Sequence, residues 1–406
     1  MTDLANRTWP LAINEDPLFK GKATTGEVSM SVGKSFVGRG YMMCKELGFH
    51  GINRPIPADE SRITSLAVGG RGRIWGATSG ERVHVFLYCR RPSEDLVMDV
   101  GVIPGAKQAR GTVVAWTHHT CFVGASPAPG KIYKCSHRGA GGCIQEWVHG
   151  YGTITEFAAP VPDEGIACLV GDKNRGCLYG LTDRTGTFFI VEVEDGGKDV
   201  GLKAKEVKII GEVDEIRNFS RTLIVANDGT VYGAGAVGRL FSYDPLCTPA
   251  IRRLDVSIPA IAGKHMYARV DSWAVDPFTG LIYGGTAHDG LLFQFDSSRM
   301  KMKSLGKPTS ETRIRAITVG NGGTVYGVSG EENSLGHFFA YDPAEGSLDD
   351  LGIPIAMTEI RRYGYEFDAA VTGPDGEIYL GESDRGGCLF IHFPAIPKRT
   401  RPEPEE

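Results

Sequence analysis

The residues of this chain that could do chemistry are arginines, histidines and tyrosines that precede a series of short apolar runs. Five arginines hold this position: Arg62, Arg221, Arg269, Arg313 and Arg315. A guanidinium binds a carboxylate through two parallel hydrogen bonds, so arginines that converge would favour an anionic ligand. Histidine and tyrosine side chains beside them could move a proton to or from that ligand. The candidate bases and acids are His50, His265, His288, Tyr267 and Tyr363.

These residues occupy fixed places within an internal repeat. The segment Thr-Val-Tyr-Gly at 230–233 recurs at 324–327, and related segments place an aromatic anchor residue one or two positions before a glycine. The anchors are Trp75, Phe122, Tyr179, Tyr232, Tyr283, Tyr326 and Tyr379. Turn dipeptides such as Asp228-Gly229 precede them and indicate β-hairpins. Each period contains four short strands, A to D, and four strands in about 40–50 residues is the pattern of a β-propeller blade.

Seven anchors predict an all-β chain folded as a seven-bladed β-propeller. The last repeat supplies only strands A to C. The segment Met43–Gly48 resembles a strand D, so we predict that this N-terminal strand completes the last blade and closes the ring. The predicted domains are an N-terminal extension over residues 1–39, a single propeller over residues 40–394, and a disordered tail over residues 395–406.

Strand order decides on which face of the ring the candidate residues lie. In an antiparallel blade, the D–A connection and the B–C loop share one face, here called the loop face. The A–B and C–D turns share the other, the turn face. The D–A connections are long and varied, so the loop face is the expected ligand face. Aligning the blades puts one group of residues at a common level of strand A, facing the channel. This group is Thr64, Arg221, Asp271, Arg315 and Asp368.

Four other histidines are expected to have no catalytic role. The adjacent His118 and His119 align with the A–B turn at Asp228-Gly229, which places them on the turn face, opposite the arginines. His84 and His337 share one register of strand C, and we expect both of them to be structural.

Other interpretations of the charged and metal-binding residue types stay open. The arginines could pair with Asp271, Asp368 and Glu366 and form a structural polar plug. Asp271 and Asp368 could instead hold a structural Ca²⁺, which takes carboxylate oxygens. Two thiols and two imidazoles could bind a structural Zn²⁺, although their spacing matches no standard zinc module. These zinc candidates are Cys135, His137, Cys143 and His149.

Composition limits the partners and the location. The chain has 406 residues and a formal net charge of −5, which argues against nucleic acid as a partner. No apolar run reaches the roughly 20 residues of a membrane helix, so no membrane partner is expected. The nine cysteines are scattered, which favours free thiols. No signal peptide is predicted, so the expected location is the cytoplasm, or outside the cell for a chain whose leader has been removed. The oligomeric state stays open.

The repeat with Tyr-Gly anchors and an Arg/His/Tyr-lined mouth resembles the propeller-fold polysaccharide lyases of the ulvan lyase and rhamnosyl-glucuronate lyase type, over about residues 40–394. This architectural resemblance implies an enzyme that cleaves an acidic, uronic-acid-containing oligo- or polysaccharide by β-elimination. One of the five His and Tyr candidates would remove the C5 proton, another would act as acid, and the five arginines would neutralise the carboxylate. The alternatives are another propeller enzyme, such as a lactonase or a metal-assisted small-molecule lyase, or a non-catalytic binding propeller.

Overall fold

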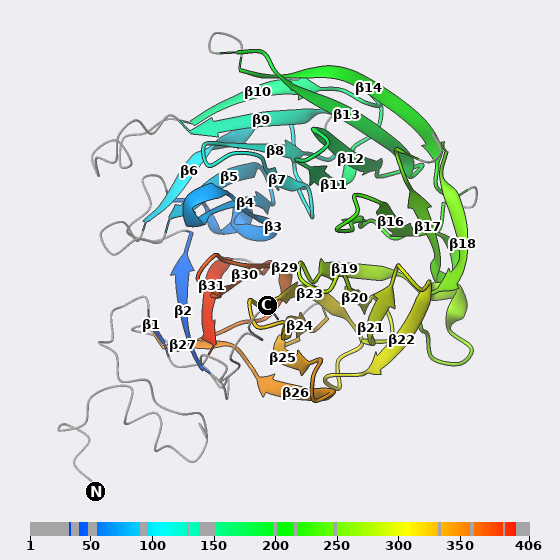
Figure 1. Cartoon of the computed structure of the whole chain (residues 1–406). Coiled ribbons are helices and arrows are strands. Elements are labelled where there is room, and N and C mark those ends of the chain that lie inside the picture. Colours follow the sequence, from blue (N-terminus) through cyan, green and yellow to red (C-terminus); the bar gives the residue numbers. More distant parts are fainter. Residues whose placement is uncertain are drawn as a thin grey trace, which may run out of the picture.

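The computed structural model describes residues 32–33, 40–47, 55–89, 96–127, 130–137, 152–197, 201–214, 217–246, 250–331, 334–357, 361–384 and 386–394. Their strands form seven sheets arranged in a ring, with strand A of each sheet nearest the axis (Figure 1). The all-β, seven-bladed propeller predicted from the repeat is confirmed. No helix among these residues is long and apolar enough to cross a membrane.

The first four blades follow one another along the chain. Blade 1 contains β3 (Arg62–Val68), β4 (Arg73–Ser79), β5 (Val83–Cys89) and β6 (Leu96–Ile103). Blade 2 contains β7 (Val113–Ala115), β8 (Thr120–Gly124), β9 (Ile132–His137) and β10 (Gly152–Ala158). Blade 3 contains β11 (Ile166–Asp172), β12 (Cys177–Thr182), β13 (Thr187–Asp195) and β14 (Leu202–Glu212). Blade 4 contains β15 (Ile224–Val225), β16 (Val231–Ala234), β17 (Arg239–Tyr243) and β18 (Arg252–Ser257).

The remaining three blades complete the ring. Blade 5 contains β19 (Val270–Val275), β20 (Ile282–Thr286), β21 (Leu292–Asp296) and β22 (Lys301–Gly306). Blade 6 contains β23 (Ile314–Val319), β24 (Val325–Ser329), β25 (His337–Asp342) and β26 (Ser347–Gly352). Blade 7 contains β29 (Phe367–Thr372), β30 (Ile378–Glu382) and β31 (Cys388–Pro394) from the end of the chain. Short 3₁₀ turns lie in the connections: η2 (Ala58–Glu60), η3 (Gly70–Gly72), η4 (Ala236–Gly238) and η5 (His265–Tyr267).

The predicted closure of the ring is confirmed. Strand β2 (Gly40–Glu46) pairs antiparallel with β31 and supplies the fourth strand of blade 7, and β1 (Val32–Gly33) adds a fifth. A hairpin of β27 (Ile355–Met357) and β28 (Arg361–Tyr363) precedes β29. Its Arg362 forms a two-pronged ion pair with Glu46 of β2, with N···O distances of 2.7 and 2.9 Å. Apart from β1, the predicted extension and the predicted tail lie outside the described residues.

The glycine that follows the anchor in strand B has a steric cause. In blade 5, Gly284 is paired across the sheet with Phe293 of strand C, whose ring lies over the glycine. A Cβ atom at Gly284 would lie 2.1 Å from that ring. The same Gly–Phe pair recurs in blades 1, 3, 4 and 6. The Tyr-Gly repeat therefore encodes a close approach between strands B and C.

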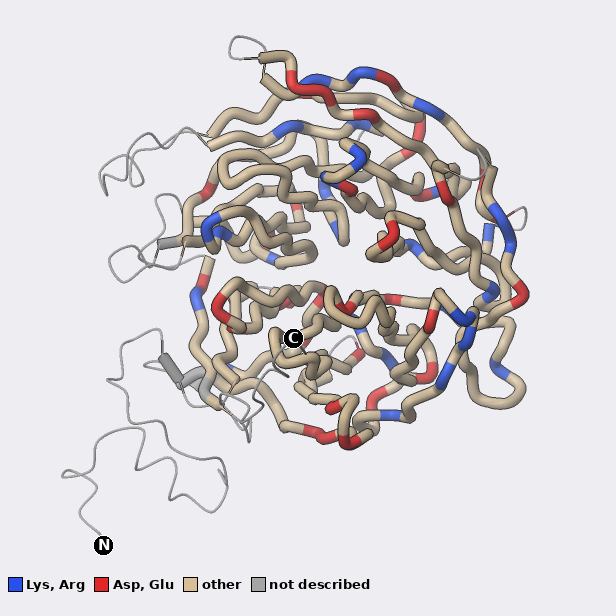
Figure 2. The backbone as a smooth tube through the Cα atoms, viewed as in Figure 1, with Lys and Arg blue, Asp and Glu red and all other residues tan. Residues whose placement is uncertain are grey.

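The core lies between neighbouring blades. The anchor tyrosines are buried and contact aromatic rings of adjacent blades: Tyr232 meets Phe295 edge to face at 5.3 Å between centroids, and Tyr379 meets Tyr88 at 5.8 Å. The outermost strands carry interspersed acidic and basic residues, as along β14 and β18 (Figure 2). Charges on these edges oppose pairing with strands of other molecules.

Candidate functional site at the loop face

Strand A carries a β-bulge at the same position in five blades. In β3, β11, β19, β23 and β29 the pairing with strand B skips one residue close to the loop face. The extra residues are Thr64, Ala167, Asp271, Arg315 and Asp368. A bulge leaves its extra residue out of the ladder and re-aims the side chain. Four of these five side chains are polar, and all four line the channel.

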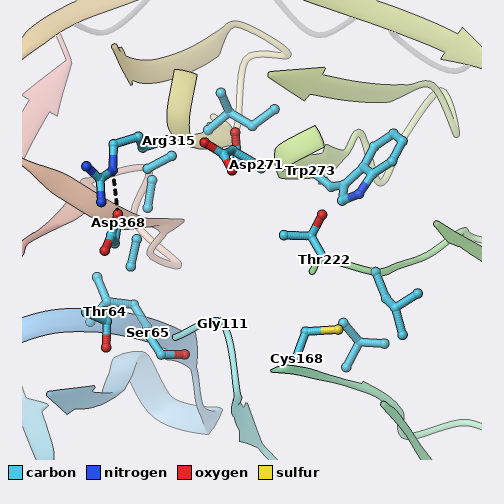
Figure 3. Close-up of a pocket in the computed structure, with 17 residues that line it drawn as sticks. Thr64, Ser65, Gly111, Cys168, Thr222, Asp271, Trp273, Arg315 and Asp368 are labelled. Carbon is cyan, nitrogen blue, oxygen red and sulfur yellow. Dashed lines mark hydrogen bonds and ion pairs between the residues drawn. The ribbon is translucent and has the colours of Figure 1, made fainter. Parts of the chain in front are cut away.

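These four residues surround a cavity of about 150 Å³ on the propeller axis, which we call the axial cup (Figure 3). Its wall consists of Thr64, Asp271, Arg315 and Asp368. Residues two positions further along each strand point the same way and form the floor of the cup. The floor includes Leu66, Trp273, Ile317 and Ala370. The lining of the cup also contains Ser65, Gly111, Cys168, Val170, Thr222, Leu223, Ser272, Ala316 and Ala369. The cup therefore has a charged wall toward the loop face and an apolar floor.

Ion pairs hold the wall of the cup. Arg315 Nε donates to Asp368 Oδ1 at 2.7 Å, and its Nη1 lies 3.4 Å from Glu366 Oε2. Arg110, from the connection before blade 2, reaches the same Asp368 oxygen at 3.2 Å. Burial alone would raise the pKa of Asp368, but Arg110 and Arg315 outweigh it and hold that pKa below its ordinary value.

A second charge pair lies beside the first. Arg313 forms a fork with Asp271, with Nε on Oδ2 and Nη2 3.1 Å from Oδ1. The carboxylates of Asp271, Asp368 and Glu366 are thus matched by three guanidinium groups, those of Arg110, Arg313 and Arg315. These are the pairs that the polar-plug interpretation expects. Two of the five candidate arginines are therefore already neutralised by carboxylates.

The positive charges of the other three candidate arginines are not offset by a carboxylate of the described residues. Arg269 is held by a neutral amide, since its Nε donates to Asn218 Oδ1 at 3.0 Å. Arg221 donates to the carbonyl oxygen of Asp183 at 3.2 Å, and the cup residue of blade 4 is its neighbour Thr222. The side chain of Arg62 is exposed. Within the part of the chain that the structure describes, none of the three has a carboxylate partner.

Tyr267 and His288 meet on the loop face of blade 5. Their rings are edge to face with centroids 6.4 Å apart, and Tyr267 is 58% exposed. Asn218 joins them to Arg269, because its Nδ2 donates to the carbonyl oxygen of Met266 at 3.2 Å while its Oδ1 binds Arg269. We call Asn218, Tyr267, Arg269 and His288 the rim patch.

The remaining candidate bases and acids lie elsewhere. His265 is exposed at the start of η5, two residues before Tyr267. Tyr363 is half-buried on β28, two blades away from the rim patch. His50 lies outside the described residues.

His118 and His119 lie in the A–B turn between β7 and β8, on the turn face. Arg73 locks this turn: its Nη1 donates to the carbonyl oxygen of His118 and to His119 Nδ1, both at 2.9 Å. Burial, with His118 and Arg73 nearby, lowers the pKa of His119 to about 4. The imidazole of His119 is therefore neutral at physiological pH, on the face away from the cup.

His84 belongs to a buried polar cluster at the start of strand C of blade 1. Its Nε2 lies 2.7 Å from Glu60 Oε2 and its Nδ1 3.2 Å from Asp99 Oδ2. Burial alone would lower the pKa of His84, but the hydrogen bonds to Asp99 and Glu60 raise it above its ordinary value. His337, in the same register of blade 6, likewise reaches Asp350 of strand D at 3.1 Å.

Burial raises the pKa of Glu382, at the end of β30, to about 7. Its carboxylate has a structural role, and the two hydrogen bonds that it accepts lower the pKa rather than raise it. One carboxylate oxygen accepts the N–H of Cys388 at 3.1 Å and the other accepts that of Tyr365 at 3.2 Å. In other blades a threonine hydroxyl accepts the same N–H at the start of strand C; these are Thr78, Thr182 and Thr286. Glu382 thus replaces a structural threonine.

Among the residues that line or flank the cup, Trp273, Thr222 and Arg110 were not predicted from the sequence. Trp273 follows Asp271 by two positions, so the strand period would have found it. Thr222 was missed because the aligned register selected its neighbour, Arg221. Arg110 precedes the three-residue strand β7, which offers little pattern for alignment.

The metal hypotheses gain no support from the described residues. No group of three or more His, Cys, Asp or Glu side chains there could hold a metal ion. The carboxylates of Asp271 and Asp368 are each bound in an ion pair with an arginine. Of the zinc candidates, Cys143 and His149 lie outside the described residues.

The sequence matches no protein-family model and no curated protein. Solved structures match the fold. Virginiamycin B lyase from Staphylococcus aureus, bound to quinupristin, matches with a TM-score of 0.57 and 11% identity over 87% of this chain and 99% of that one. The extracellular domain of a one component system from B. thetaiotaomicron matches with a TM-score of 0.54 and 13% identity over 86% of this chain. This chain covers 39% of that longer one. At such identities the likeness shows the propeller fold alone.

Proposed function

We propose that this protein is a lyase that cleaves a uronic-acid-containing glycan by β-elimination at the rim patch. One observation carries the proposal: Arg269 is oriented by a neutral amide, without a carboxylate partner among the described residues, beside the contact between Tyr267 and His288. The patch thus combines an uncompensated positive charge with two proton-transfer groups.

The chemistry of β-elimination uses both features of the patch. A base takes the proton from C5 of the uronate, the electron pair forms the C4–C5 double bond, and the C4–O4 bond breaks as an acid protonates O4. The intermediate charge spreads into the carboxylate, so a guanidinium bound there stabilises the transition state. Arg269 is assigned this role, and Tyr267 and His288 supply the proton acceptor and donor. One structural neighbour, virginiamycin B lyase, carries the name of a lyase and supports the proposal by fold-level analogy.

The test is incubation of the full chain with ulvan, gum arabic and other uronate glycans, followed by the ultraviolet absorbance of the unsaturated uronate product. Arg269→Ala and Tyr267→Phe should each lower the rate about 100-fold or more, the usual contribution of such groups. His118→Gln on the turn face is the matched control and should leave the rate unchanged. If no glycan of the panel yields the unsaturated product, the lyase proposal is wrong.

A non-catalytic binding propeller is the second candidate. The exposure of the rim patch favours it, because Tyr267 and the neighbouring Met266 are 58% and 60% exposed. Enzyme sites usually exclude water around the reacting groups. Calorimetry that shows glycan binding dependent on Arg269, without any unsaturated product, would establish this candidate in place of the first.

A further inference from the structure

The geometry points to a second binding site, the axial cup, for a neutral polyhydroxylated six-membered ring such as a hexopyranose. This inference stands apart from the proposed lyase activity, because it uses none of the rim-patch residues. It rests on the charge balance of the wall, the composition of the floor and the size of the cavity.

Together with its ion-pair partners Arg110, Arg313 and Glu366, the wall offers donors and acceptors without net charge. Arg315 and Asp368 have side chains only 10% and 6% exposed, and each is bound to an opposite charge. A carboxylate ligand would meet Asp271 and Asp368, whereas a cation would meet Arg315. A hydroxyl group both donates and accepts, so neighbouring hydroxyls can bind a carboxylate and a guanidinium together. The balanced wall therefore favours a neutral polyol over either kind of ion.

The floor suits the apolar face of a sugar ring. Trp273 lies on the cup, opposite the Arg315–Asp368 pair (Figure 3). The indole is fixed by a perpendicular contact with Phe293 at 5.4 Å between centroids. Leu66, Ile317 and Ala370 complete an apolar surface. Small-molecule sites usually combine such apolar walls with a few placed polar groups.

The size of the cup limits its occupant to one ring. Its volume of about 150 Å³ equals that of an engineered cavity that binds benzene. A longer chain would have to lie across the loop face above the cup.

The polar side chains are held in place before any ligand arrives. The four wall residues each occupy a bulge, and three of them are tied by ion pairs or forks between blades. Binding would therefore order few side chains, which lowers its entropic cost.

Ligand-observed NMR tests this site with four probes: methyl glucopyranoside, methyl galactopyranoside, myo-inositol and methyl glucuronide. At least one neutral probe should bind, and in the Arg269→Ala variant, which lacks the rim-patch arginine, it should bind about tenfold more tightly than the glucuronide. Ala370→Leu fills the cup and should weaken that binding about tenfold or more. Trp273→Leu removes the indole and should do the same, because a tenfold change corresponds to about 1.4 kcal/mol, within the range of a lost aromatic contact.

Two controls separate the cup from other surfaces. Trp116→Phe changes a tryptophan on the turn face with a similar edge contact, 5.4 Å from Phe122, and should leave binding unchanged. Arg269→Ala should also have no effect. Folding of every variant is checked by circular dichroism, and Ala370→Leu remains informative if Trp273→Leu fails to fold. The proposal is overturned if no neutral probe binds, if Ala370→Leu binds the neutral probe as well as the wild type does, or if the glucuronide binds more tightly than every neutral probe to Arg269→Ala, which lacks the rim-patch arginine.

Discussion

The turn face and the loop face lie at opposite ends of the same strands A, yet they satisfy their polar groups in different ways. On the turn face, side chains donate to backbone carbonyl groups of the next blade. These links are Arg73 to His118, Arg175 to Gly229, Asn227 to Pro277, and Asn321 to Pro374, at 2.9, 2.6, 3.1 and 3.2 Å. On the loop face, the charged side chains around the cup bind one another across blades, while Arg221 and Asn218 nearby donate to backbone carbonyl groups.

This difference suits the contacts of the turn face to holding the fold and the side chains around the cup to binding a ligand. A turn whose backbone carbonyl is bound by the preceding blade has a fixed shape, because the link holds its main chain. The charged groups around the cup pair with other side chains and still border an open cavity. The histidine pair His118-His119, although conspicuous in the sequence, belongs to the first arrangement.

The largest effect is expected at the wall of the cup. Asp368→Ala removes the closest carboxylate partner of Arg315 and Arg110 and leaves the buried guanidinium of Arg315 with only the longer contact to Glu366, at 3.4 Å. Breaking a buried pair in this way costs about 3–5 kcal/mol. Urea unfolding measures the change. Arg62→Ala, at the exposed mouth, should alter the free energy of unfolding by less than about 0.5 kcal/mol. Equal effects of the two variants would contradict the assignment of Asp368 as the link between blades.

An intermediate effect should distinguish two arginines, one on each face. Arg73 is only 5% exposed and donates to the turn at His118, so Arg73→Met should lower the free energy of unfolding by about 1.5–3 kcal/mol. Arg269→Met on the loop face removes an exposed guanidinium and should cost less than about 0.5 kcal/mol. Thermal and urea unfolding of both variants test the comparison, which fails if Arg269→Met is the more damaging change.

The smallest effect is a pH dependence of opposite sign on the two faces. The raised pKa of His84, on the loop face, contributes stability that is present below about pH 6.5 and is lost as pH rises through the folded-state pKa. The lowered pKa of His119, on the turn face, means that stability is lost as pH falls from about 6.5 toward 4.

The measurement is the urea midpoint at pH 5.5 and pH 8.5. His84→Gln should destabilise the protein more at pH 5.5 than at pH 8.5, because the raised pKa stabilises the folded state at the lower pH. His119→Gln should raise the midpoint relative to wild type at pH 5.5 and change it little at pH 8.5. Parallel pH profiles for His84→Gln and His119→Gln would rule out opposite roles.

The ring could be predicted from the sequence because the signals are local and repeated. Each Tyr-Gly anchor marks a glycine that packs under a phenylalanine of strand C, and each turn dipeptide indicates a hairpin. The closing strand was predicted because Met43–Gly48 resembles a strand D and blade 7 lacks one.

The site could be predicted only in part. Two-residue periodicity put Thr64, Asp271, Arg315 and Asp368 at one level, and the structure has them around one cup. The bulges that aim these side chains leave no compositional mark. Which arginines are neutralised depends on carboxylate partners such as Asp368, which is far from Arg110 and Arg315 in the sequence and belongs to a different blade.

The closing blade also determines how the ring would respond to a pulling force. Gly40 is paired with Pro394, so the two ends of the propeller leave the sheet from the same end of the β2–β31 ladder. Tension between residues 40 and 394 would load the hydrogen bonds of this ladder one after another, as in a zipper, because they run perpendicular to the strands. The strand that seals the circle is therefore also where mechanical unfolding would begin, at low force, before any other blade is loaded.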